Sequence, residues 1–428
     1  MDHFNYIDGV LHAEDVPLPA IAEAVGTPFY CYSTATLQRH ARVFRDAVAG
    51  TPDPLVAFAV KANPNIAVLA VLAREGLGAD VVSGGELHRA LMAGIPPSRI
   101  VFSGVGKTDD ELIAALDAGI YQINVEGEPE LDRLSEIATR RGQQAPVALR
   151  ANPDVDAGTI AKISTGKAEN KFGIPWDRIP GLYARATALP GIRPVGIAAH
   201  IGSQLRDLAP LETAWTRLGE LAGDLRANGL PVSRIDLGGG LGIPYDPDLP
   251  APPPPSAYGA LAERVIAGWP DGGRGMSVIF EPGRLIAGNA GILVSTVITI
   301  KDGGQRRFVV LDAAMNDLIR PTLYEAWHDI LAVAPRPGRE TVTVVGPVCE
   351  TGDQFAEDRG VTPMQAGDLV ALMTAGAYGA TMASTYNSRS LIPEVLVDGG
   401  RFAIVRERQT IDMMLKQEHL PPWMESKA

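Results

Sequence analysis

The feature that most constrains the fold is a repeated alternation of strand-like and helix-like segments that begins near residue 54. Each unit has a short apolar or β-branched run, a polar turn and a stretch with apolar residues at three- and four-residue spacing, which is typical of a helix packed on a sheet. The expected strands are LVAFAV (55–60), GADVVS (78–83), RIVFSG (99–104), YQINVE (121–126), PVALRAN (146–152), PVGIAAH (194–200), RIDLGG (234–239) and SVIFEP (277–282). Eight units in about 230 residues predict a (β/α)8 barrel of the TIM type. An open doubly wound sheet is the alternative, but such a sheet rarely needs eight consecutive units of one kind.

After residue 285 the pattern changes to strand-like runs joined by Gly, Pro and Asp turns, with little helix between them. These runs are ILVSTVITIKD, RRFVVLDA, ETVTVVG, DLVALMT and PEVLVDGGRFAIVRER. They predict a second, C-terminal β domain, either a barrel or a sandwich. We therefore expect a barrel domain over residues 26–283 and a β domain over 284–428, to which residues 1–25 contribute.

Net charge, hydrophobic runs and cysteine content limit the class of protein to which this chain can belong. A formal net charge of −12 argues against a surface for nucleic acid or anionic membrane. No apolar run approaches the roughly eighteen residues of a membrane span, and we expect no signal peptide. The only two cysteines, Cys31 and Cys349, are too few for a disulfide framework and fit a reducing cytoplasm. We expect a cytoplasmic enzyme or binding protein with no metal site.

Unusual residues gather where the expected strands end. Lys61 follows the apolar run in PLVAFAVKANPN (54–65), although a lysine is rarely buried without a partner. HIGSQ (200–204) follows strand six, GGGLG (238–242) follows strand seven and EPGR (281–284) follows strand eight. Taken alone, each of these segments has an ordinary structural explanation: a surface lysine, a core histidine, a turn and an ion pair. In a β/α barrel, however, these strand ends form the active site.

This combination of groups suits pyridoxal 5'-phosphate. A Gly-rich loop after strand seven lets backbone N–H groups approach a phosphate. Lys61 would bind the cofactor's aldehyde covalently, and we expect its apolar strand to desolvate the amine. Glu281 would accept a hydrogen bond from the ring nitrogen and keep that nitrogen protonated, so that the ring withdraws electrons.

The motifs FAVKAN, HIGSQ, GGGLGIPY and EPGR, in this order, resemble the fold-type III pyridoxal-phosphate decarboxylases. RPTLYEAWH (320–328), GPVCETGD (346–353) and GAYG (376–379) resemble more narrowly the diaminopimelate decarboxylases of that family. The resemblance runs from about residue 8 to 415. It implies decarboxylation of meso-2,6-diaminopimelate to L-lysine and CO2, the last step of lysine biosynthesis.

The resemblance also implies a role for each matching residue. The implied catalytic residues are Lys61, Cys349 as proton donor, and His200, which stacks on the cofactor ring. The implied cofactor-binding residues are Lys61, His200, Ser203, Gly239, Gly240, Glu281, Pro282, Gly283, Arg284 and Tyr378. The implied substrate-binding residues are Arg284, Arg320, Tyr324, Glu350 and Tyr378. In the family the chain forms a homodimer with shared active sites, in which Cys349 and Glu350 reach into the partner's site.

Physical chemistry agrees with the substrate roles. Arginine guanidinium groups, which bind carboxylates through two N–H donors, suit the distal carboxylate of diaminopimelate, and Glu350 suits its distal ammonium. Decarboxylases for ornithine, arginine or carboxynorspermidine are alternatives with the same fold, although those substrates lack the distal amino-acid centre. An alanine-racemase-like enzyme and a non-enzymatic pyridoxal-phosphate-binding protein are less favoured. Two loops depart from the family pattern: residues 157–171 lack a histidine often found there, and residues 388–393 lack a Pro-Arg-Pro-like run.

Overall fold

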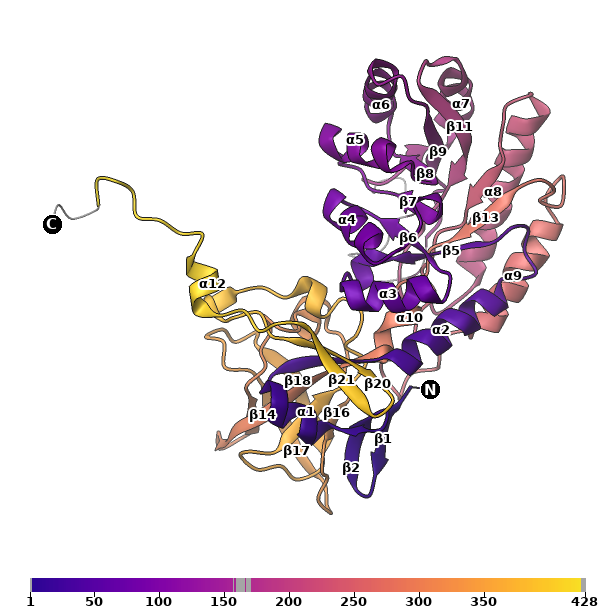
Figure 1. Ribbon diagram of the computed structural model, residues 1–428. Helices are drawn as coiled ribbons and strands as arrows, with labels where there is room; N and C mark the ends of the chain where they lie inside the picture. Colours follow the sequence, from indigo (N-terminus) through magenta and orange to yellow (C-terminus); the bar gives the residue numbers. More distant parts are fainter. Residues whose placement is uncertain (1, 157, 159–165, 167–170, 425–428) are drawn as a thin grey trace. The chain divides into compact units, whose positions relative to one another are not determined.

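The computed structural model describes residues 2–156, 158, 166 and 171–424 (Figure 1). It divides into two compact units. The barrel unit is Thr36–Gly288, and the second unit combines Met1–Ala35 with Asn289–Ala428. Most of the departing loop at 157–171 lies outside the described residues.

The barrel unit contains all eight strands that the sequence predicts. They are β5 (Leu55–Ala59), β6 (Gly78–Val81), β7 (Ile100–Phe102), β8 (Gln122–Val125), β9 (Ala145–Asn152), β11 (Ile192–Ala198), β12 (Arg234–Asp236) and β13 (Ser277–Phe280). All neighbours pair in parallel, and the ring closes because β13 pairs with β5 and β9 pairs with both β8 and β11. The predicted TIM-type barrel is confirmed, and an open sheet is excluded. A short strand, β10 (Ile174–Pro175), adds to β9.

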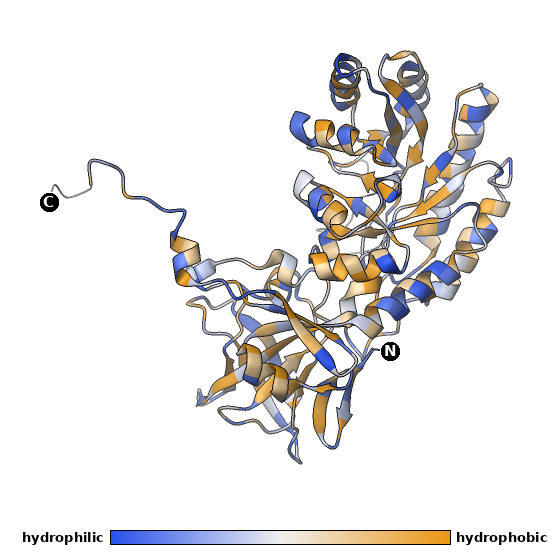
Figure 2. Ribbon diagram, in the orientation of Figure 1, coloured by the Kyte–Doolittle hydropathy of each residue, from blue (hydrophilic) through white to orange (hydrophobic). Residues whose placement is uncertain are grey.

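Helices surround the barrel strands (Figure 1). They are α2 (Thr34–Ala47), α3 (Ile66–Arg74), α4 (Gly84–Met92), α5 (Asp109–Ala118), α6 (Glu128–Arg140), α7 (Ile179–Ala188), α8 (Ala209–Ala227), α9 (Pro255–Ala267) and α10 (Arg284–Ala287). Local signals set their ends: α5 begins at a Thr108–Glu111 capping box and stops at Gly119, whose left-handed backbone favours glycine. Hydrophobic and hydrophilic residues alternate along these helices (Figure 2), as expected for helices with one face on the barrel.

The interior of the barrel changes character along its axis. Near the start of the strands, Leu55, Ala57, Val101 and Ile279 form a buried apolar cluster. Nearer the carboxyl ends, the buried side chains are polar, among them Ser103, Asn124, Asp80 and Asp236. Buried polar groups of this kind are costly unless they are paired or serve a ligand. This end of the barrel is therefore where a site is expected.

The second unit is built on a nine-stranded sheet. Its strands are β4 (Phe29–Ser33), β14 (Gly291–Asp302), β15 (Arg307–Leu311), β16 (Ile330–Ala332), β17 (Glu340–Val345), β18 (Gln354–Val361), β19 (Leu369–Leu372), β20 (Glu394–Asp398) and β21 (Arg401–Arg406). The long strand β14 is central, since it pairs with β4, β15 and β19. All the strand-like runs predicted after residue 285 are strands, and the predicted separate β domain is confirmed.

One strand of this sheet comes from a segment that the sequence led us to place in the barrel. Strand β4 lies within residues 26–35, yet it pairs with β14 and β20 of the second unit. All five of its residues are buried, so its continuous apolar run has the same pattern as a barrel strand. The hydrophobic pattern alone therefore could not decide whether this strand belongs to the barrel or to the second sheet.

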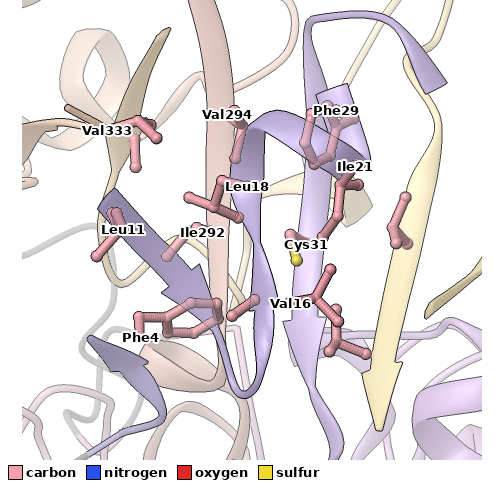
Figure 3. Close-up of a cluster of buried hydrophobic side chains, with 14 residues drawn as sticks. Phe4, Leu11, Val16, Leu18, Ile21, Phe29, Cys31, Ile292, Val294 and Val333 are labelled. Atoms are coloured by element: carbon pink, nitrogen blue, oxygen red, sulfur yellow. The ribbon is translucent and has the colours of Figure 1, made fainter. Parts of the chain in front are cut away.

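The N-terminal residues also belong to the second unit. Strands β1 (Phe4–Ile7), β2 (Val10–Ala13) and β3 (Val16–Pro17) form a small antiparallel sheet, followed by α1 (Leu18–Val25). Figure 3 shows side chains of these elements packed with those of β4 and β14. The short helices α11 (Arg320–Tyr324) and α12 (Ile411–Leu415) complete this unit.

No helix within the described parts of the chain has the length and apolar character needed to cross a membrane. Cys31 is a free, buried thiol, and Cys349 is a free, exposed one.

Candidate active site

Lys61 lies directly after β5, in a single 3-10 turn, η1 (Val60–Ala62). Its Nζ atom forms an ion pair with Oδ2 of Asp80 at 3.0 Å, and its side chain is 37% exposed while that of Asp80 is fully buried. The surroundings therefore differ from the apolar ones expected from the sequence. Because β6 lies beside β5, its inward-facing acid holds the amine at the carboxyl end of the barrel.

Two further buried acids, Asp236 and Glu281, lie at the same end of the barrel. Burial raises the pKa of Asp236 to about 6, although hydrogen bonds from Asn124 and the Gly238 N–H oppose the rise. The pKa of Glu281 is raised well above its usual value, first by burial and then by the neighbouring charges of Asp236 and Asp80. Oε1 of Glu281 is buried and finds no hydrogen-bond partner among the residues that the structure describes. A cationic N–H group placed here would satisfy that oxygen and favour the ionised carboxylate.

His200 follows β11 and has a neutral ring. Its Nδ1 atom accepts a hydrogen bond from the Gly239 N–H at 3.2 Å. Desolvation lowers the pKa of His200 well below its usual value, and the charges of Lys61 and Arg150 lower it further. An imidazole held in this way offers a flat, uncharged face to a flat ligand.

The Gly-rich turn after β12 brings backbone segments unusually close together. A Cβ on Gly239 would lie 2.1 Å from the carbonyl oxygen of Glu281. A Cβ on Gly240, whose φ is +106°, would lie 2.4 Å from the carbonyl oxygen of Gly202. Only glycine fits at either position, so a ligand can approach the backbone of this turn without meeting a side chain.

A buried arginine lies beside this turn. Arg284 donates hydrogen bonds through Nη2 to Oγ of Ser203 at 3.1 Å and through Nη1 to the hydroxyl of Tyr245 at 2.9 Å. Gly283 lets the EPGR segment pack on β5 and η1, because a Cβ there would lie 3.0 Å from that of Ala59. The carbonyl of Pro282 accepts the Ala59 N–H at 3.0 Å. Arg284, Ser203 and the glycines together form an anion-binding environment.

In the second unit, Arg320 begins α11 and Tyr324 ends it. Arg320 is only 4% exposed, and its Nε atom donates to Nε2 of His328 at 3.3 Å. Tyr378 is partly buried and has a positive φ of +56° in the GAYG turn. A buried guanidinium such as that of Arg320 is costly to desolvate, so it is suited to bind an anion.

Cys349 and Glu350 lie on an exposed loop of the same unit. The Cys349 N–H donates to Oδ1 of Asn387 at 2.9 Å. A hydrogen bond with Glu350 raises the pKa of Tyr386. The loop is shaped from inside by Asp353, whose carboxylate accepts the backbone N–H of Val348 at 2.7 Å. The thiol is thus presented on an ordered turn and is not part of the core.

The predicted site residues therefore form two sets. The set in the barrel unit is Lys61, His200, Ser203, Gly239, Gly240, Glu281, Pro282, Gly283 and Arg284. The set in the second unit is Arg320, Tyr324, Cys349, Glu350 and Tyr378.

Comparison with known proteins agrees with this division. Residues 34–288 match the family model described as pyridoxal-dependent decarboxylase, pyridoxal binding domain. The chain is 52% identical to a diaminopimelate decarboxylase of Zymomonas mobilis, over 98% of this chain and 99% of that protein. The chain belongs to the diaminopimelate decarboxylase family.

Other members of the family extend this similarity. A diaminopimelate decarboxylase of Vibrio cholerae is 49% identical over 99% of this chain and all of that protein. The crystal structure of the diaminopimelate decarboxylase of M. jannaschii in co-complex with L-lysine has a TM-score of 0.94 at 34% identity, covering 99% of both chains. The similarity thus spans both units and both sets of residues.

The barrel residues fit pyridoxal 5'-phosphate, the cofactor of this family. Oε1 of Glu281, which has no hydrogen-bond partner within the described part of the chain, suits a protonated ring nitrogen. The turn at Gly239 and Gly240 has no room for side chains and suits a phosphate, and the amine of Lys61 lies at the same end of the barrel.

Several residues that shape the site were not predicted. Asp80 and Asp236 pair with the predicted residues in the barrel, as Tyr245 does with Arg284. In the second unit, His328 accepts a hydrogen bond from Arg320, and Asn387 accepts one from the backbone of Cys349. Asp80 and Asp236 had a usable signal, because an acid inside a buried strand is as unusual as the lysine that follows β5.

Proposed function

We propose that this chain decarboxylates meso-2,6-diaminopimelate to L-lysine and CO2, the last step of lysine biosynthesis, with pyridoxal 5'-phosphate as cofactor. The observation that carries the proposal is the identity of 52% to a named diaminopimelate decarboxylase along nearly the whole chain. A relative of known structure was crystallised with L-lysine, the product of the proposed reaction.

Pyridoxal phosphate, when bound, supplies a protonated ring that withdraws the electron pair left at Cα when CO2 departs. Lys61 would hold the cofactor covalently through Nζ. The Glu281 carboxylate would accept the ring N–H and keep that proton in place, and the neutral imidazole of His200 would pack against the ring. Arg284, Ser203 and the turn at Gly239 and Gly240 would bind the phosphate region.

The second unit supplies the groups for the distal end of the substrate. Arg320 binds the distal carboxylate and Glu350 binds the distal ammonium, while Tyr324 and Tyr378 direct hydroxyl groups to the same end. A substrate without that carboxylate, such as ornithine, leaves a buried guanidinium without its anion, which is costly. This is the reason to prefer diaminopimelate over the other basic amino acids.

Cys349 donates the proton that replaces the lost carboxylate at Cα. We propose that the protein is a homodimer in which Cys349 and Glu350 of each chain complete the site of the partner. The exposure of both residues in the single chain supports this arrangement, and a two-fold axis would give two identical sites. A cytoplasmic location remains a prediction from cysteine content.

The reaction is tested with the stereoisomers of the substrate. Purified protein loaded with cofactor should convert meso-diaminopimelate to L-lysine, identified by chiral chromatography, and should leave L,L-diaminopimelate unchanged because that isomer has no D centre. Lys61→Ala is the matched inactive control. Absence of lysine from the loaded wild-type protein would refute the proposal.

The cofactor attachment is tested separately. Borohydride reduction followed by peptide mapping should place the cofactor on the peptide that contains Lys61. Lys171, the last residue of the departing loop at 157–171, also lies in the barrel unit and is the comparison lysine. Label on Lys171, or undiminished label in Lys61→Ala, contradicts the assignment of Lys61.

A further inference from the structure

We propose that His328 is a positioning residue that directs Arg320 toward the distal carboxylate of the substrate. The inference rests on the proposed function, because it assumes that Arg320 binds substrate. It adds a residue outside the predicted site and gives that residue a role exerted through Arg320.

The contacts of His328 define which ring nitrogen carries its proton. Its Nδ1 atom lies 2.8 Å from the carbonyl oxygen of Met373. A carbonyl only accepts, so Nδ1 is the protonated nitrogen of the neutral ring. Nε2 is then an acceptor, and it receives the Nε–H of Arg320 at 3.3 Å. The imidazole thus links a fixed backbone carbonyl to the guanidinium.

Both partners of this bond are buried. His328 is 1% exposed and Arg320 is 4% exposed. A hydrogen bond to a charged group in such surroundings is stronger than one in water. The bond engages Nε, and it therefore fixes the direction in which the fork of Nη groups points. Holding a binding group in its bound orientation reduces the entropy lost when the ligand binds.

The backbone of His328 is held in place without help from the ring. Immediately after it, β16 pairs with β19 in the register Ile330 to Leu372. The Met373 N–H donates to the carbonyl of Asp329 at 2.8 Å. Nη1 of Arg359 donates to the carbonyl of His328 itself at 3.0 Å. The strand pair already has its hydrogen bonds, so the ring is available to orient Arg320.

The same strand end connects His328 to a second substrate residue. Met373, whose carbonyl accepts the hydrogen bond from Nδ1–H of His328, directly follows β19, and Tyr378 follows Met373 by five positions. The imidazole therefore ties Arg320 to the segment that carries Tyr378. Both residues are proposed to meet the distal end of the substrate.

Two substitutions distinguish the roles of the two ring nitrogens of His328. In His328→Asn, an amide N–H can replace Nδ1–H at Met373, but the acceptor for Arg320 is lost. In His328→Gln, the amide oxygen can replace Nε2 and still accept from Arg320. In the cofactor-loaded enzyme, His328→Asn should raise the KM for meso-diaminopimelate by about tenfold or more, with a smaller change in kcat. The KM of His328→Gln should be closer to the wild-type value.

His12 provides the matched control. Its Nδ1 also lies close to a backbone carbonyl, that of Val10 at 2.9 Å, and no arginine among the described residues donates to its ring. His12→Asn and His12→Gln should leave KM unchanged. Cofactor content and melting temperature, measured on every variant, report any general loss of folding.

The proposal is overturned if His328→Asn keeps the wild-type KM, or if His328→Gln raises KM as much as His328→Asn does. If His328→Asn does not fold, 15N NMR of histidine-labelled wild-type enzyme, assigned with His328→Gln, decides the question. It should show an Nδ1–H tautomer for His328, and an Nε2–H tautomer contradicts the proposed bond. A wild-type enzyme that forms no lysine refutes the proposed function instead, and the tautomer measurement remains valid.

Discussion

Replacing Gly239 by alanine tests whether the close approach of two strand ends creates the cofactor site. The new Cβ would lie 2.1 Å from the carbonyl oxygen of Glu281, about 1.3 Å inside an ordinary contact of 3.4 Å. The backbone cannot easily move aside, because the Glu281 N–H donates to the carbonyl of Gly238 at 2.8 Å. Relieving the clash displaces the carboxylate of Glu281 and the N–H that Gly239 donates to His200.

The expected cost of this overpacking is about 1–3 kcal/mol in the free energy of unfolding. Cofactor affinity should fall by at least about tenfold, because residues on both sides of the cofactor move. Urea unfolding followed by fluorescence measures the first quantity, and absorbance titration with pyridoxal phosphate measures the second. Gly106→Ala is the control, since a Cβ there has nothing within 4 Å. If Gly239→Ala matches wild type in both measurements, the close-approach account is wrong.

Three further predictions concern charge and assembly. The raised pKa of Asp236, about 6, means that the folded chain binds a proton more tightly than the unfolded chain, so stability is lost as pH rises from about 4 to 6. In urea unfolding of cofactor-free protein, Asp236→Asn should therefore lose less stability over this pH range than wild type; equal pH slopes contradict it. Arg320→Ala should weaken substrate binding by about 2–5 kcal/mol, measured as KM, and Arg320→Lys should restore only part of it; an unchanged KM excludes a carboxylate contact. Lys61→Ala and Cys349→Ala should each be nearly inactive, and co-expression should regain activity through one native site per mixed dimer; verified mixed dimers without activity exclude a shared site.

The barrel was predictable because its signal is local and repeated. Each unit carries an apolar run and a helix with its own start and stop, as in α5 with Thr108 and Gly119. Strand β4 was not predictable, because five consecutive buried residues fit a barrel strand as well as a strand of the second sheet. Its partner β14 lies more than two hundred residues later, and no local feature of the sequence indicates that pairing.

The residues of the site were likewise predictable only in part. Lys61, His200 and Glu281 could be chosen from the sequence because each ends a strand whose position follows from the repeat. The acid that holds Lys61 and the histidine that holds Arg320 depend on strand register. A shift of one residue in β6 would turn Asp80 to the other face, and His328 is placed by the pairing of the next strand, β16, with β19, so both roles become visible only in three dimensions.

The most direct test of the account is the ratio of kcat/KM for meso-diaminopimelate to that for L-ornithine and L-arginine, measured as CO2 release by the cofactor-loaded protein. The buried Arg320 and the proposed partner for a distal ammonium, Glu350, require an amino-acid centre at the far end of the substrate. We predict a preference of at least about a hundredfold for meso-diaminopimelate, with L-lysine as the amino-acid product. Comparable rates with L-ornithine or L-arginine would contradict the proposed substrate.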